Sequence, residues 1–195
     1  MKGPRLSVGL VLILLGLAAA APAQELSLSV GAGGFFPSDG AYRQIYGSNL
    51  SVGGDLWFRL KGPIGFAAGL GRLSDKGVAV PTDGGEEAYP LKFRRTSIPL
   101  LVFYQIDVRA VAIRLGAGAG IHSYRETWQT VDLDFKGHKV APRIVLAVSV
   151  ALLDKLSLLC SSCYEPIRTG AGSPLSANID LGGFQLMGGL AFRIF

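Results

Sequence analysis

Eight stretches of this chain alternate apolar side chains with small or polar ones at a period of two residues, the pattern of a half-buried β-strand. They cover residues 25–36, 49–60, 64–74, 94–106, 111–124, 140–152, 156–167 and 182–195. The first, third, fifth and seventh connections between them are long and polar, whereas the second, fourth and sixth have about three or four residues. This rhythm predicts antiparallel neighbours, with short turns at one end and long loops at the other.

The composition agrees with strands that face lipid. Hydrophobic residues make up 49% of the chain, which has 27 glycines. Beyond the first residues, however, no segment approaches the ~18 consecutive apolar residues of a membrane-spanning helix. Each stretch, at about 10–13 residues, is long enough to cross a bilayer at barrel tilt. The sequence therefore predicts an all-β fold, an eight-stranded antiparallel up-and-down transmembrane β-barrel, with its narrow lumen filled by side chains rather than open as a pore.

The first residues have the features of a secretion signal. Lys2 and Arg5 precede the apolar run Leu10–Leu17, and small residues follow at Ala21–Ala23. We expect residues 1–23 to be a cleaved signal peptide and residues 24–195 to form the barrel domain, located in the bacterial outer membrane. An amino-terminal membrane anchor is the alternative, although the apolar run is short for a full span.

The two faces of the predicted strands differ in polarity. The outward face is aliphatic and aromatic, and Arg72 is its one apparent cation, near the loop end of its strand. Outward aromatic residues suit two interfacial girdles: Phe36, Tyr164 and Phe184 at the loop end, and Phe58, Tyr104 and Phe192 at the turn end. The inward face is mostly Gly, Ala and Ser, with charges at Asp55, Arg59, Arg95, Arg114, Arg143, Glu165 and Arg193.

These inward charges predict a structural network of ion pairs in the lumen, with Arg143, Glu165, Asp55 and Arg114 as members. The turn at residues 153–155 places Leu152 opposite Leu156. Because antiparallel partners keep a constant sum of residue numbers, Arg143 then faces Glu165. Arg59, Arg114 and Arg193 fall near the turn end, where Asp107 is the one obvious acidic partner. A polar conduit or proton path is the alternative role for these charges.

The two cysteines, Cys160 and Cys163, form a C-x-x-C motif. In a strand, residues three apart point to opposite faces, so Cys160 is expected to face lipid and Cys163 the lumen, which disfavours a disulfide. A zinc site would need two further ligands, and the chain has only two scattered histidines. We therefore expect no metal site, no cofactor and no catalytic residue.

The glycine-rich strand IRLGAGAGIHSY and the terminal GGLAFRIF resemble those of the small outer-membrane β-barrel proteins, the OmpA- and OmpX-like barrel domain. The resemblance covers nearly all of the chain after the leader. It implies an integral outer-membrane protein with a structural or surface-interaction role, in contact with outer-membrane lipid or lipopolysaccharide. The terminal aromatic is similar to the signal read by the barrel-assembly machinery, but Ile194, not Phe195, continues the outward row.

Partner contacts are expected in the long loops, especially Asp75–Phe93 and Arg125–Lys139. The sequences of these loops do not indicate which extracellular partner would bind. The net charge of +5 is not clustered with aromatic residues, so nucleic-acid binding is not expected.

Two other functions remain open. A soluble exported barrel that binds a ligand would need the opposite polarity, with an apolar interior. Some members of the resembled family modify lipid A with a His, a Ser and an acid, and His122, Ser123 and Glu126 lie at about the corresponding height. Adjacent residues of a strand face opposite sides, however, so His122 and Ser123 are not expected to form a dyad, and we expect no enzyme. His138 is expected to be a solvated loop residue.

Overall fold

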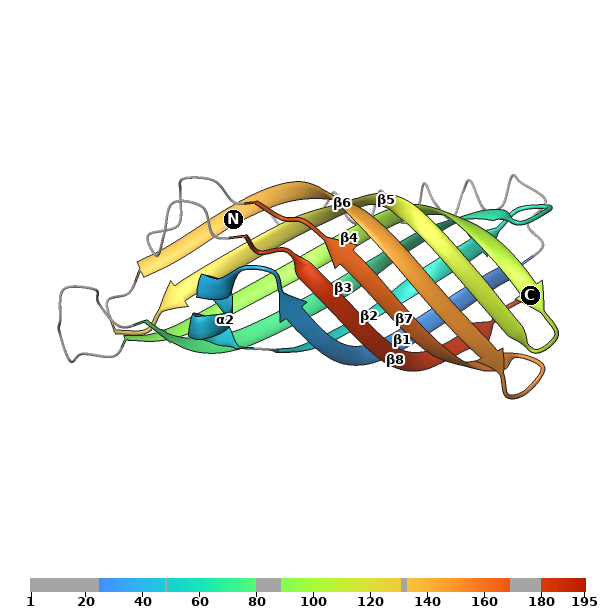
Figure 1. Ribbon diagram of the computed structural model, residues 1–195, viewed down its shortest axis with the longest axis horizontal. Helices are drawn as coiled ribbons and strands as arrows, with labels where there is room; N and C mark the ends of the chain where they lie inside the picture. Colours follow the sequence, from blue (N-terminus) through green and yellow to red (C-terminus); the bar gives the residue numbers. More distant parts are fainter. Residues whose placement is uncertain (1–24, 48, 80–88, 131–132, 169–179) are drawn as a thin grey trace.

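The computed structural model describes residues 25–47, 49–79, 89–130, 133–168 and 180–195. They form a closed barrel in which every strand pairs antiparallel with its neighbours in sequence and β1 pairs with β8 (Figure 1). The strands are β1 (Glu25–Pro37), β2 (Asn49–Arg59), β3 (Ile64–Ala79), β4 (Tyr89–Val108), β5 (Val111–Trp128), β6 (Leu133–Ala151), β7 (Leu156–Glu165) and β8 (Gly183–Arg193). The expected eight-stranded up-and-down barrel is confirmed. The expected signal peptide lies outside the described residues.

Side chains alternate between the two faces as the period of two requires. On β2, Trp57 points inward and is 3% exposed, whereas Val52 points outward and is 46% exposed. Exposed outward side chains form an apolar band around the barrel, including Val30, Phe66, Leu70, Val102, Leu115, Ile144, Leu158 and Leu190. The expected aromatic residues point outward, and Phe36, Phe184 and Tyr164 lie side by side in register on β1, β8 and β7.

The strands β3 to β6 are longer than the sequence pattern predicted. β3 continues to Ala79 and β4 begins at Tyr89, so both ends of the expected Asp75–Phe93 loop, residues 75–79 and 89–93, are paired strand. β5 and β6 likewise extend to Trp128 and Leu133 as a hairpin, within the segment treated as a loop or as a raised hairpin. Extension is favoured because each added residue satisfies backbone donors and acceptors in the ladder. The wall formed by β3 to β6 therefore rises beyond the rest of the barrel (Figure 1).

A short helix, α2 (Gly40–Tyr46), interrupts the first long connection and was not predicted. Asp39 caps its amino end by accepting a hydrogen bond from the Tyr42 backbone N–H at 3.0 Å. Gly47 ends it with a φ of 71°, a conformation that glycine adopts without strain. Among the residues described, no helix is long and apolar enough to cross a membrane. The helix lies at the end of the barrel opposite the carboxy-terminus (Figure 1).

The carboxy-terminus differs from a simple continuation of β8. The strand ends at Arg193, and the side chains of Ile194 and Phe195 are both exposed. Their backbone still pairs with β1, because the Ile194 N–H donates to the Leu26 carbonyl at 2.8 Å and the Leu26 N–H donates to the Phe195 carbonyl at 3.1 Å. Phe195 thus lies beyond the strand's alternation, as expected from its phase.

Candidate functional site: the interior of the barrel

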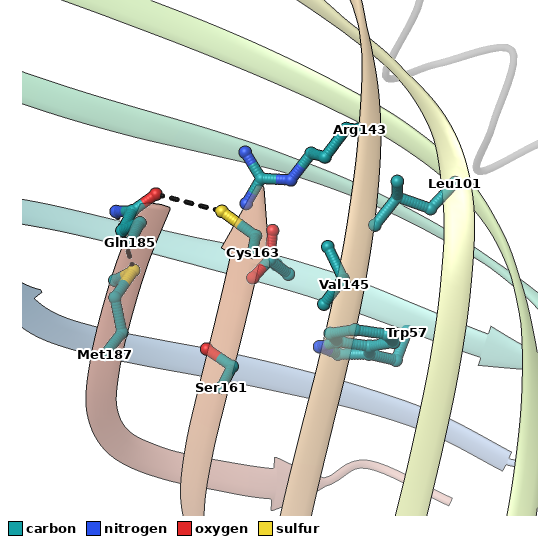
Figure 2. A pocket seen from close by; sticks show the side chains of 9 residues that line it. Trp57, Leu101, Arg143, Val145, Ser161, Cys163, Gln185 and Met187 are labelled. Atoms are coloured by element: carbon teal, nitrogen blue, oxygen red, sulfur yellow. Dashed lines mark hydrogen bonds between the residues drawn. The ribbon is translucent and has the colours of Figure 1, made fainter. Parts of the chain in front are cut away.

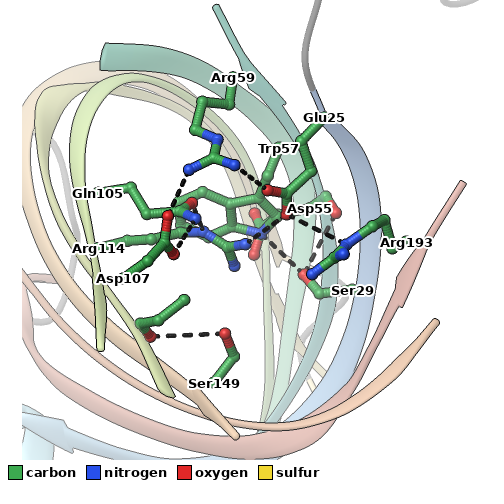
Figure 3. Close-up of polar contacts among 11 residues, drawn as sticks. Glu25, Ser29, Asp55, Trp57, Arg59, Gln105, Asp107, Arg114, Ser149 and Arg193 are labelled. Atoms are coloured by element: carbon green, nitrogen blue, oxygen red, sulfur yellow. Dashed lines mark hydrogen bonds and ion pairs between the residues drawn. The ribbon is translucent and has the colours of Figure 1, made fainter. Parts of the chain in front are cut away.

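The interior consists of four layers, and the lowest, at the short-turn end, is an ion-pair network centred on Glu25 (Figure 3). Glu25 lies 2.9 Å from Arg59, 3.3 Å from Arg114 and 3.9 Å from Arg193. Arg59 also contacts Asp107 at 2.5 Å. The carboxylate of Glu25 is 8% exposed and shared among three guanidinium groups, so it holds β1, β2, β5 and β8 together across the lumen.

The expectation that Asp107 is the one obvious acidic partner of these arginines was wrong. The missing carboxylate is Glu25, the first residue of β1. Its odd number places it in the inward phase with Ser27 and Ser29, and that signal was available in the sequence. Gln105 links the network further, because its Nε2 donates to Asp107 at 2.7 Å and its Oε1 accepts from Arg114 Nε at 2.8 Å.

Above this network lies an apolar layer built around Trp57. The Trp57 ring packs edge-on against Phe103, with centroids 5.2 Å apart, and its Nε1 donates to Ser29 Oγ at 3.0 Å. The Arg114 guanidinium lies 5.1 Å from the ring centroid, a cation–π contact that connects this layer to the ion-pair network below it, the floor of the lumen. The other buried members are small or aliphatic: Ala67, Leu101, Val145, Ala147, Leu159, Cys163 and Ala191.

The third layer contains the Arg143–Glu165 ion pair expected from the register. Arg143 Nη1 donates to Glu165 Oε1 at 2.7 Å, and both side chains are buried. His122 Nε2 lies 3.6 Å from the same oxygen, and the His122 side chain is 0% exposed. Arg95 is also buried, where it donates to the Leu181 carbonyl and lies 4.4 Å from the centroid of the Phe35 ring. This layer therefore holds two guanidinium groups, those of Arg143 and Arg95, beside one carboxylate.

The other two residues expected in the network behave differently. Arg114 is paired, but with Glu25 on the floor rather than with Arg143 or Glu165. Among the described residues Asp55 has no ion pair within 4.0 Å, although Arg143 lines the same small cavity. Register alone could not show that Asp55 and Arg143 line one cavity, because β2 and β6 are not neighbouring strands and face each other across the lumen.

The cavity beside Asp55 has a volume of about 20 Å³, which is about the space of one water molecule (Figure 2). Cys163 Sγ lies 3.3 Å from Gln185 Oε1, and Gln185 Nε2 contacts both Ser51 Oγ and Met187 Sδ. A larger pocket of about 160 Å³ opens at the short-turn end, lined by the floor network. In the part of the chain described, the middle of the lumen is occupied by side chains.

The fourth layer is an aromatic cap formed where α2 folds over the lumen. Tyr42 and Tyr46, one helical turn apart, are buried against Phe93, with ring centroids 5.6 Å and 5.4 Å away. The Tyr42 hydroxyl donates to Asp75 Oδ2 at 2.6 Å. On β3 the apolar band ends at Leu70, so Asp75 lies above it. Burial raises the pKa of Asp75 to about 6 and also raises the pKa of Tyr42.

The residues considered for chemistry are not brought together. His122 points into the lumen and Ser123 is exposed on the outer face, so no dyad forms. Glu126 instead accepts a hydrogen bond from Trp128 Nε1 at 2.8 Å. Cys160 is exposed and Cys163 is buried, both as free thiols. Within the described ranges, no group of three or more His, Cys, Asp or Glu residues could hold a metal ion. His138 lies on β6 rather than in a loop.

Comparison with known proteins provides structural but not sequence matches. No protein-family model matches the chain, and no curated protein matches its sequence. The outer-membrane protein OprG of Pseudomonas aeruginosa superposes with a TM-score of 0.71 at 14% identity, over 89% of this chain and 97% of OprG. The chain has the fold of the small outer-membrane β-barrels.

Two further small outer-membrane barrels are similar to the chain. Neisserial surface protein A superposes with a TM-score of 0.57 at 17% identity, over 86% of this chain and 96% of that protein. Ail, the attachment invasion locus protein of Yersinia pestis, crystallised with the heparin analogue sucrose octasulfate, gives 0.56 at 12% identity, over 87% and 98% of the two chains. At these identities the likeness concerns the fold.

Proposed function

We propose that this protein is an integral protein of the bacterial outer membrane, in which a closed and filled barrel carries a structural or surface-interaction role. The observation that carries the proposal is the inverted polarity of the barrel. Val30, Leu70 and Val140 are 57%, 59% and 69% exposed on the outside, while Glu25, Arg114 and Glu165 are buried inside. Such an exterior is costly in water and favourable in hydrocarbon.

Closure of the sheet supports a membrane location for a second reason. In hydrocarbon, each unpaired backbone N–H or C=O costs several kcal/mol, so a spanning sheet must have no free edge. Here β1 pairs with β8 over eleven consecutive residue pairs, from Ser27 with Arg193 to Pro37 with Gly183. The barrel therefore satisfies its own backbone at every strand that would meet lipid.

The filled lumen argues for a scaffold rather than a conduit. An open path would have to pass the aromatic cap, the Arg143 layer and the Trp57 layer, which are packed with large buried side chains. Planar-bilayer recording provides the test: we expect no steady conductance from the folded protein. Stable, reproducible open channels would contradict the scaffold role while leaving the membrane location intact.

Neither alternative function, a soluble ligand-binding barrel or a lipid A-modifying enzyme, has the structural feature that it would require. A soluble ligand-binding barrel needs an apolar cavity, whereas the 160 Å³ pocket is lined by Arg59, Arg114 and Glu25. An enzyme acting on lipid A would need His122 and Ser123 on one face, and they lie on opposite faces. We therefore propose a non-enzymatic protein, and analysis of lipid A from cells with and without expression would test this point.

Two measurements test the membrane proposal. After cell fractionation, the protein should remain with the outer membrane and require detergent for release; release without detergent would rule the proposal out. The variant Val102→Arg, outward in the middle of the apolar band on β4, should lose about 2–4 kcal/mol of folding free energy in lipid. The matched variant Val78→Arg, outward above the apolar band, should lose at most about 1 kcal/mol. Equal tolerance of both variants would favour a water-exposed exterior.

A further inference from the structure

The outer surface of β3 to β6 changes abruptly from apolar to cationic above one row of residues. The continuous apolar band ends on these four strands at Leu70, Ile98, Ile121 and Val140, of which the last three are cross-strand partners. Val78, near the outer end of β3, is a separate apolar residue above the band. The outward positions above them carry Arg72, Lys76, Lys92, Arg94, Arg125, Lys136 and His138, which we call the basic wall. Asp134 is the only carboxylate among the outward residues of this part of the described strands.

The cations of the basic wall are neighbours across the strands, not merely near in sequence. Arg94 pairs in register with Arg125, and Arg125 pairs with Lys136. One step further out, Lys76 pairs with Lys92. Directly opposed side chains have Cβ atoms about 5 Å apart, and like charges at that distance destabilise a sheet. A counter-anion on the wall would remove this repulsion.

Only part of that charge is neutralised within the protein. Asp134 contacts Arg125 at 2.6 Å and Lys136 at 2.8 Å, so on the β5–β6 side one carboxylate neutralises one of these two positive charges. On the β3–β4 side, Arg72, Lys76, Lys92 and Arg94 have no ion-pair partner within 4.0 Å among the described residues. An exposed sheet face with adjacent unpaired guanidinium and ammonium groups is suited to phosphate, which accepts several charge-assisted hydrogen bonds at once.

The wall is confined to one flank. The outward phases of β7, β8, β1 and β2 contain no Lys or Arg. At their outer ends these strands present Tyr164, Phe184 and Phe36 instead. The cations also lie on the outside of the strands directly above the lipid-facing row, not at the loop tips, so their natural neighbour is the headgroup region of the surrounding leaflet.

We infer that the basic wall binds the phosphate groups of the outer-leaflet glycolipid, lipopolysaccharide, so that one flank of the barrel holds phosphorylated lipid while the opposite flank contacts acyl chains alone. This inference rests on the proposed outer-membrane location. It adds a specific site and orientation to a general lipid contact. A sulfated polysaccharide approaching from outside is the competing ligand, and the experiment separates the two.

The test uses the folded protein in mixed detergent micelles, titrated with bisphosphorylated lipid A or with dephosphorylated lipid A of the same acyl composition. Bound lipid is quantified by native mass spectrometry at fixed salt. The wild type should prefer the phosphorylated form. The variant Lys92→Gln/Arg94→Gln should bind it about 30-fold more weakly, because each basic residue near an anionic surface contributes roughly a fivefold factor. Raising the salt concentration should reduce the difference.

The matched control is Lys61→Gln/Lys155→Gln, which removes the same charge from exposed turns at the opposite end of the barrel and should leave lipid A binding unchanged. A heat-dependent shift in gel mobility shows that each variant is folded. Equal binding of the two lipid A forms by a folded wild type would overturn this inference alone, whereas a protein that stays soluble without detergent would overturn the proposed function. The same protein is also titrated with heparin fragments, and binding of these fragments without binding of lipid A would overturn the inference in favour of the polysaccharide.

Discussion

Replacing Glu165 by Gln should be among the most destabilising single changes in the barrel interior. The Glu165 side chain is 3% exposed, and its Oε1 lies 2.7 Å from Arg143 and 3.6 Å from His122. The substitution keeps the shape but removes the charge, leaving the buried guanidinium groups of Arg143 and Arg95 in one layer without that carboxylate. Removing one partner of a buried ion pair costs about 3–5 kcal/mol, because the remaining charge stays desolvated.

The assay is reversible urea unfolding of the protein in lipid vesicles, followed by tryptophan fluorescence and extrapolated to zero denaturant. Asp154→Asn, in an exposed turn, is the matched control and should change the free energy of unfolding by at most about 0.5 kcal/mol. The double variant Arg143→Met/Glu165→Leu should be much less destabilised than Glu165→Gln, because it leaves no unpaired charge from the pair. A loss below about 1 kcal/mol for Glu165→Gln would refute the reasoning. So would a double variant whose loss of unfolding free energy equals the summed losses of the single variants Arg143→Met and Glu165→Leu.

Three further predictions follow from the described geometry. Gly189→Ala should destabilise the barrel by about 1–3 kcal/mol in the same assay, because a Cβ there would meet the β1 backbone, whereas Gly188→Ala, with open space around it, should not. Burial raises the pKa of Asp75 from 3.8 to about 6, so the aromatic cap should be most stable below about pH 4 and lose stability as the pH rises through 6. The measurement is hydrogen exchange of the α2 amides, corrected for the intrinsic exchange rate. An exchange rate that does not fall with acidification would contradict this prediction. In the folded protein, a membrane-permeant maleimide should modify Cys160 and spare Cys163, and mass spectrometry should detect no disulfide between them.

Much of the interior could be predicted from the sequence where it depends on neighbouring strands. The Arg143–Glu165 pair followed from one short turn and a constant sum of residue numbers, because a hairpin turn fixes the register of the whole ladder. The opposite faces of Cys160 and Cys163, and of His122 and Ser123, followed from the strand period. Glu25 was missed because it begins its strand, although its phase already placed it inside.

Other features could not be read from strand periodicity. The cap helix α2 has seven residues, too few for a periodic signal. Its position depends on Tyr42 and Tyr46 packing against side chains of the strands at the end of the barrel. The extra length of β3 to β6 depends on partners that are equally long, so no single strand specifies it. The basic wall likewise became visible only when Arg94, Arg125 and Lys136 were brought side by side.

By itself, the sequence determined the number of strands, their order and which side chains face inward, since alternation and turn length act between residues close in the chain. Only the tertiary structure decided which inward residues meet across the lumen. Glu25 and Arg114 are 89 positions apart and belong to strands that do not pair with each other. Their contact depends on how the closed sheet is tilted and staggered, and that geometry is a property of the whole barrel rather than of any hairpin within it.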